Sequence, residues 1–240
     1  MESDMPNKKE SGEIEKIADI FISPRKVFQN INQKPTWLIP LLLELIIFAI
    51  LFLMITDVTK QDQLKLMTAR GMAQNNIDAS QSMGQNPVMI GLQIFLILMT
   101  LLVTLLSLSG IFSIAKSIFN GEANFAKTFS VVCWSYLIAI PEEIIKTFLI
   151  LSKGTLHGIT ISMAFFLPPL EIGQKPATLF TFLSNINPFT IWYLLLLIFG
   201  LSIINNFTFK KSSIIIGSLW VVWIIISVVL RSIFGNMFGI

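Results

Sequence analysis

Residues 125–151 have the sequence FAKTFSVVCWSYLIAIPEEIIKTFLIL and form the third of five long apolar runs in the chain. The run is long enough to cross a membrane as a helix, which needs about 20 apolar residues. It nevertheless carries Glu142, Glu143 and Lys146 directly after Pro141. An ionised side chain at the bilayer centre costs about 2.5–3.5 kcal/mol, so these groups need partners or water. This run is therefore the expected centre of the molecule.

The spacing of these charges predicts a local ion pair. Glu142 lies four residues and Glu143 three residues before Lys146, and both spacings bring side chains together on a helix. We expect Glu142 to pair with Lys146, and Glu143 to face another helix, a partner subunit or water. Glu44, in the first apolar run, completes a candidate intramembrane charge cluster. For Glu44 a structural hydrogen bond is favoured over a transport role.

The composition is that of a membrane protein. Charged residues make up 13% of the 240 residues, against about 25% in an ordinary soluble domain, and 54% are hydrophobic. The net charge of +3 is small and its basic residues are scattered, which argues against nucleic acid as a partner. The single cysteine, Cys133, excludes an internal disulfide.

The apolar runs predict an all-α integral membrane protein with five transmembrane helices. The expected spans cover about residues 37–55, 86–115, 125–151, 187–207 and 214–233. Pro141 should kink the third helix just before the two glutamates, because proline lacks the amide of an internal helical bond. The expected domains are a cytoplasmic N-terminal segment, 1–36, and a membrane domain, 37–240. Lys and Arg are more frequent in loops on the N-terminal side, which predicts a cytoplasmic N-terminus and an outside C-terminus.

A short amphipathic helix is predicted before the first span. Ser23 and Pro24 are typical of a helix N-cap and first helical residue. The helix combines an apolar face with basic groups suited to anionic headgroups, and we expect it to lie on the inner membrane surface. Docking on the protein's own loops is the alternative. The candidate membrane-surface residues are Arg25, Lys26, Val27, Phe28 and Ile31.

The second span carries a polar stripe on one face. Its residues are spaced seven, four and three apart, so a helix places them in line. Small and hydroxylated residues commonly join membrane helices, which favours a helix contact over a hydrophilic pathway. The candidate helix-contact stripe consists of Gln93, Thr100, Thr104 and Ser107.

Several motifs resemble those of the YIP family, the Rab-interacting Golgi membrane proteins and their bacterial relatives. The phrase NPFTIW at 187–192, followed by LLLL at 194–197 and GLS at 200–202, resembles the fourth-span signature of that family. Weaker similarities are Ser23-Pro24 with Phe28, Phe119-Asn120-Gly121 with Phe125 and Phe129, and Ser135-Tyr136 followed by Pro141. The resemblance covers about residues 20–235. It implies a five-span, non-catalytic membrane adaptor that acts through partners.

No catalytic or cofactor site is expected. The one histidine, His157, lies in a predicted loop, and no zinc, phosphate-loop or hydrolase motif is present. Paired glutamates also occur in glutamic intramembrane proteases, but the spacing to Lys146 and the lack of further histidines argue against that class. We expect no metal and no cofactor.

The expected function is that of an accessory or scaffold subunit that assembles with or stabilises a larger membrane complex, such as an export or toxin-resistance transporter. The expected partners are membrane lipids and other integral membrane proteins such as transporter subunits. A composition rich in Ile, Asn, Lys and Phe is typical of an AT-rich bacterium, so the expected location is a bacterial cytoplasmic membrane. The alternative is a small transporter or channel with a polar path lined by the second and third spans.

Overall fold

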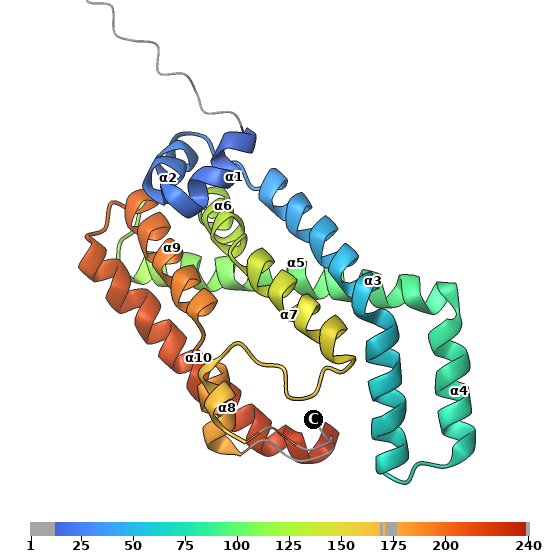
Figure 1. Ribbon diagram of the computed structural model, residues 1–240. Helices are drawn as coiled ribbons and strands as arrows, with labels where there is room; N and C mark the ends of the chain where they lie inside the picture. The colour runs from blue at the N-terminus through green and yellow to red at the C-terminus, as the bar shows by residue number, and fades with distance from the viewer. Residues whose placement is uncertain (1–12, 169, 171–176, 239–240) are drawn as a thin grey trace, which may run out of the picture.

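The computed structural model describes residues 13–168, 170 and 177–238, and every regular element within those residues is helical (Figure 1). The elements are α1 (Glu13–Ile22), α2 (Pro24–Gln33), α3 (Leu38–Ala69), α4 (Gln74–Gln85), α5 (Pro87–Ile118), α6 (Phe125–Tyr136), α7 (Ala139–Lys153), the 3₁₀ turn η1 (Met163–Phe166), α8 (Thr178–Ser184), α9 (Pro188–Ile204) and α10 (Phe209–Phe238).

Four helical stretches of the described chain are long and apolar enough to cross a membrane. They are α3, α5, the pair α6–α7, and Phe209–Leu230 of α10. A fifth span exists if α8 and α9 are taken together, although these helices meet at a bend of 52°. The prediction of an all-α membrane protein is confirmed, and the fifth span depends on this bent pair.

Three helices of the membrane domain, α5, α6 and α9, begin at an asparagine that caps the helix. The side chain of Asn86 accepts a hydrogen bond from the amide of Val88, and Asn124 accepts one from Lys127. Asn187 does the same for Thr190 at the start of α9. Each cap satisfies an amide that has no partner within its own helix. The predicted helix starts at Asn86 and Asn187 are therefore confirmed.

The pair α6–α7 lies in the middle of the molecule (Figure 1). Helices α5 and α9 pack against α6, and α3 packs mainly against α7. In the apolar window of this span 56% of the residues are buried, compared with 11–17% in the other three spans. Trp134 is fully buried, and its indole N–H donates to the carbonyl oxygen of Thr36 between α2 and α3.

The third span is broken before its charged residues. Residues Leu137 and Ile138 separate α6 from α7, and the amide of Ile140 bonds back to the carbonyl of Leu137 at 3.1 Å. The break lies earlier in the chain than expected, and the chemistry of proline explains its position. Pro141 has no N–H to donate to Leu137, four residues before it, and its ring crowds that carbonyl. Pro141 instead occupies the first turn of a new helix, where proline is tolerated.

Helix α9 approaches α6 and α2 closely at Gly200. A Cβ atom at this position would collide with Cγ1 of Val131 and lie 3.0 Å from Cε1 of Phe28. Contact this close requires a residue without a side chain. The GLS phrase at 200–202 thus has a packing role in this protein.

Helix α2 does not place its apolar face in lipid. Val27, Phe28 and Ile31 are buried in the same core as α6 and α9. The predicted helix and its apolar face exist, but the prediction that this face lies on the membrane surface is wrong. Helices α6 and α9 pack against α2 and cover these three side chains, so the N-terminal helices contribute to the core of the membrane domain.

Helix α3 continues well past its apolar part, which ends near Thr56. It runs to Ala69, and the chain turns at Gly71, with φ of +67°, into α4, which packs back against α3 (Figure 1). Asp62, in this polar extension, accepts hydrogen bonds from the hydroxyl of Thr155 at 2.6 Å and the amide of Leu156 at 2.7 Å. The connection after α7 is therefore held against α3.

Candidate functional site

The charge cluster of the third span lies at the beginning of α7. The break before Ala139 creates a helix N-terminus inside the span, and Glu142 falls in its first turn. The amide ends of a helix carry partial positive charge, which stabilises a carboxylate there. The spacing of the charged residues does not reveal this stabilisation by the helix N-terminus. Pro141 is the feature of the sequence that could have predicted it.

Lys146 pairs with both glutamates. Its Nζ lies 2.8 Å from Oε1 of Glu142 and 2.8 Å from Oε1 of Glu143. The side chain of Glu142 is 13% exposed and that of Glu143 is 41% exposed. Glu143 thus lies at the outer side of the pair, and one ammonium group serves two carboxylates.

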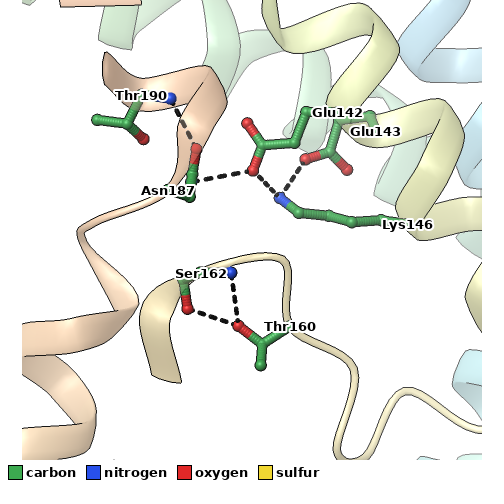
Figure 2. A network of polar contacts seen from close by, with 7 residues as sticks. All are labelled: Glu142, Glu143, Lys146, Thr160, Ser162, Asn187 and Thr190. Carbon is green, nitrogen blue, oxygen red and sulfur yellow. Dashed lines mark hydrogen bonds and ion pairs between the residues drawn. The ribbon is translucent and has the colours of Figure 1, made fainter. Parts of the chain in front are cut away.

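The contact to another helix is made by Glu142 and not, as expected, by Glu143. The amide nitrogen Nδ2 of Asn187 donates to Oε1 of Glu142 at 3.3 Å, while Oδ1 of Asn187 caps α9 by accepting from Thr190 at 2.7 Å (Figure 2). Asn187 therefore links the charged turn of α7 to the start of α9. This second role of the capping asparagine was not visible from the sequence.

A separate pair of hydroxyl groups lies in the connection after α7 (Figure 2). Thr160 Oγ1 and Ser162 Oγ are 2.6 Å apart, and the amide of Ser162 donates to Thr160 Oγ1 at 3.2 Å. Ser162 also caps the short turn η1 through the amide of Ala164. These contacts shape the loop locally.

Glu44 occupies a different place from the other three charged residues. Its side chain is fully buried in α3, and neither carboxyl oxygen has a hydrogen-bond partner among the described residues. The hydroxyl groups of Tyr193 and Ser135 are also buried without hydrogen-bond partners among the described residues. The hydrogen bond expected for Glu44 is therefore not formed within the described chain.

The polar stripe of α5 faces away from the core. Gln93, Thr100, Thr104 and Ser107 are exposed, whereas α5 is buried through Leu101, Leu105, Ser109, Phe112 and Ala115. The hydroxyls of Thr100 and Thr104 each donate to a carbonyl of their own helix at 2.8 Å. The stripe makes no core contact within the described chain. Its role in helix contact stays a prediction, and the contacted helix would belong to another chain.

The two basic residues of α2 lie at the surface. Lys26 forms ion pairs with Asp19 at 2.9 Å and Glu15 at 3.5 Å, both on α1, and Arg25 is exposed. Binding of headgroups by Arg25 and Lys26 stays a prediction, and for Lys26 it competes with the acidic residues of α1.

The chemistry of these groups is that of structural ion pairs and hydrogen bonds. Among the described residues no group of three or more His, Cys, Asp and Glu side chains is placed to hold a metal ion. Lys146 is engaged by two carboxylates, one of which is tied to α9. These contacts link α7, the second half of the broken third span, to the start of α9.

Comparison with known proteins gives one match. The model of the Yip1 domain family matches residues 18–230, which is most of the chain. Comparisons with curated proteins and with solved structures give no match. The matched range begins within α1, so the family model includes α2 together with the membrane helices.

Proposed function

The chain belongs to the Yip1 domain family, and on that premise we propose that it is a non-catalytic membrane scaffold that binds other integral membrane proteins. Its partner is proposed to be a subunit of a larger membrane complex, such as an export or toxin-resistance transporter. The proposed location is a bacterial cytoplasmic membrane, with the N-terminus in the cytoplasm.

The observation that carries this proposal is the exposed polar stripe of α5. Thr100, Thr104 and Ser107 are small or hydroxylated residues of the kind that joins membrane helices. They stay exposed while the opposite face of α5 packs on α6. A surface of this type, free in the single chain, is suited to a helix of a partner protein.

The alternative of autonomous transport has less support. A polar path would need the stripe of α5 and the charges of α7 to line one channel. The stripe instead faces outward, and Lys146 is held by Glu142 and Glu143 beside α9. A lysine whose charge is already paired with two carboxylates supports a structural link between helices more than a route for ions.

Quantitative co-purification tests the scaffold. The full chain is isolated in mild detergent from its native membrane, and recovery of integral membrane proteins is compared with that of a Thr100→Leu, Thr104→Leu, Ser107→Leu variant. Exposed Ile111 and Ile114, changed to Leu, provide the control on the same helix. Loss of defined partners in the stripe variant only is expected. A purified wild-type chain that retains no partner and conducts ions in proteoliposomes would replace the scaffold by the transport function.

The proposed orientation has its own test. Single cysteines replace Lys34, Asn75, Lys153 or Lys210 in a Cys133→Ser background, and intact cells are treated with an impermeant thiol reagent. Labelling is expected only at positions 75 and 153, which follow an odd number of spans. Labelling at position 34 would reverse the orientation.

A further inference from the structure

Helices α3, α4 and α5 line an open cavity of about 970 Å³ at their junction. Helix α3 leaves its apolar part near Thr56, α4 packs back along the polar extension, and α5 starts its own apolar run at Pro87 (Figure 1). The cavity is therefore located where two candidate spans pass from apolar to polar sequence. Its volume lies at the upper end of the range of about 300–1,000 Å³ for small-molecule sites.

The lining of the cavity divides into an apolar and a polar part. Phe52, Leu92 and Leu96 come from the apolar windows of α3 and α5, whereas Asn76 and Ser80 come from α4. The two apolar windows enter the bilayer from the same side of the junction, because α3 and α5 are consecutive spans. One end of the cavity thus meets hydrocarbon, and the other lies at the level of the lipid headgroups.

The charged groups of the lining are one cation and one anion. Nζ of Lys60 lies 3.6 Å from Oδ1 of Asp57, so the pair is looser than a hydrogen bond. The stem of Lys60 crosses α4 at Gly84, where a Cβ atom would lie 3.6 Å from its Cδ. The aliphatic stem of Lys60 therefore packs against α4 while its ammonium group stays near Asp57. A headgroup with both charges matches the pair, because phosphate meets Lys60 and a cationic amine meets Asp57.

From the amphipathic lining, the position at the membrane boundary and the balanced charge, we propose that this cavity binds one zwitterionic phospholipid drawn from the surrounding bilayer. The headgroup contacts Asp57, Lys60 and the polar side chains of α4, and the start of an acyl chain lies along Phe52, Leu92 and Leu96. An anionic lipid is disfavoured, because Asp57 opposes its net charge. The site does not depend on the scaffold function.

The test uses the full chain in liposomes of equimolar phosphatidylcholine and phosphatidylglycerol, both with photoactivatable acyl chains. The protein is extracted in mild detergent, washed free of loosely held lipid, irradiated and studied by native mass spectrometry and peptide mapping. One phosphatidylcholine per chain is expected, attached to the lining segments of α3 and α5. Its retention should exceed that of phosphatidylglycerol by about fivefold or more, a difference near 1 kcal/mol.

Two variants that fill the cavity make the result specific. Ser80→Trp on α4 and Gln93→Trp on α5 should each lower phosphatidylcholine retention by about fivefold or more, whereas Asn75→Trp, on α4 outside the lining, should not. Asp57→Asn should shift retention towards phosphatidylglycerol. Monodisperse elution shows that each variant is folded. Equal retention of the two lipids, attachment away from the cavity, or unchanged retention in both tryptophan variants would overturn the assignment.

Discussion

The third span and the second span are both long and apolar enough to cross a membrane, but they have different environments. The window of α6–α7 is 56% buried, and that of α5 is 11% buried. The more buried span has the lowest mean hydropathy of the four. Hydropathy measures the free energy of transferring side chains out of water. Because lipid is as apolar as a protein core, mean hydropathy does not predict which helix is central.

The residues that distinguish the two spans are small and polar. Helix α6 buries Thr128, Ser130 and Ser135 completely, and such residues allow close helix contact. Helix α5 has similar residues at Thr100 and Thr104 but leaves them exposed. Residue type therefore predicts the capacity for contact, and the available neighbour decides whether the contact forms within the chain.

The largest expected effect comes from overpacking the buried span. Gly200→Val places a side chain against Val131 and Phe28 and should destabilise the protein by about 3 kcal/mol. Gly110→Val on α5 is the matched control, because a Cβ atom there meets nothing within 4 Å. Thermal unfolding in detergent measures both. Equal losses at the two glycines would contradict the difference between the spans.

The next effect concerns the ion pairs of α7. Lys146→Met leaves two carboxylates without their cation and should cost about 2 kcal/mol, below the range for fully buried pairs because Glu143 is partly exposed. Glu142→Gln should cost more than Glu143→Gln, since Glu142 is more buried and also bonds Asn187.

A double-mutant cycle in detergent tests the pairing. Glu142→Gln combined with Lys146→Met should recover part of the summed loss, because the contact is removed only once. Strict additivity of the two single effects would show that these side chains do not interact.

A smaller, pH-dependent effect is expected at Asp62, outside the apolar part of α3. Burial raises the pKa of this carboxyl, but hydrogen bonds from Thr155 and Leu156, with Lys65 nearby, outweigh burial and lower the net pKa below the usual value. A lowered folded-state pKa gives stability that is present above the unfolded pKa, near 3.9, and lost as pH falls through the folded pKa.

Asp62→Asn should therefore lower stability by about 1 kcal/mol at pH 7. The difference in melting temperature between wild type and variant should shrink as pH is lowered from 5 to 3, roughly the range of aspartate titration. Asp78→Asn serves as control, because Asp78 is an exposed carboxylate on α4 outside the lining of the cavity. A difference that stays constant over this range would exclude the proposed role of the carboxylate.

The smallest effects compare one substitution on the two spans. Thr104→Val on α5 should change the stability of the isolated chain by less than about 0.5 kcal/mol, as is usual for exposed sites. Thr128→Val on α6 should cost about 1 kcal/mol, because the buried hydroxyl contacts the carbonyl of Asn124 at 3.3 Å. A larger loss at Thr104 than at Thr128 would show that the stripe already has a partner within the chain.

Sequence by itself determined the helical membrane class, the helix starts at Asn86 and Asn187, and the spacing of Glu142 and Glu143 to Lys146. These features are local, since apolar length, asparagine caps and helical spacing act within a few residues. The resemblance to the family was also visible, because the phrases that carry it are contiguous in the chain, and the family match confirms it.

Only the tertiary structure decided which apolar faces meet protein. Val27 and Phe28 have the pattern of a membrane-surface helix, yet α6 and α9 cover them. The sequence spacing shows that Glu142 can pair with Lys146, but only the structure shows that Glu44 is buried without a hydrogen-bond partner among the described residues and that Glu142 also bonds Asn187. The physical reason is that lipid and protein interiors favour the same apolar side chains, so the neighbour of each face follows from packing between distant segments.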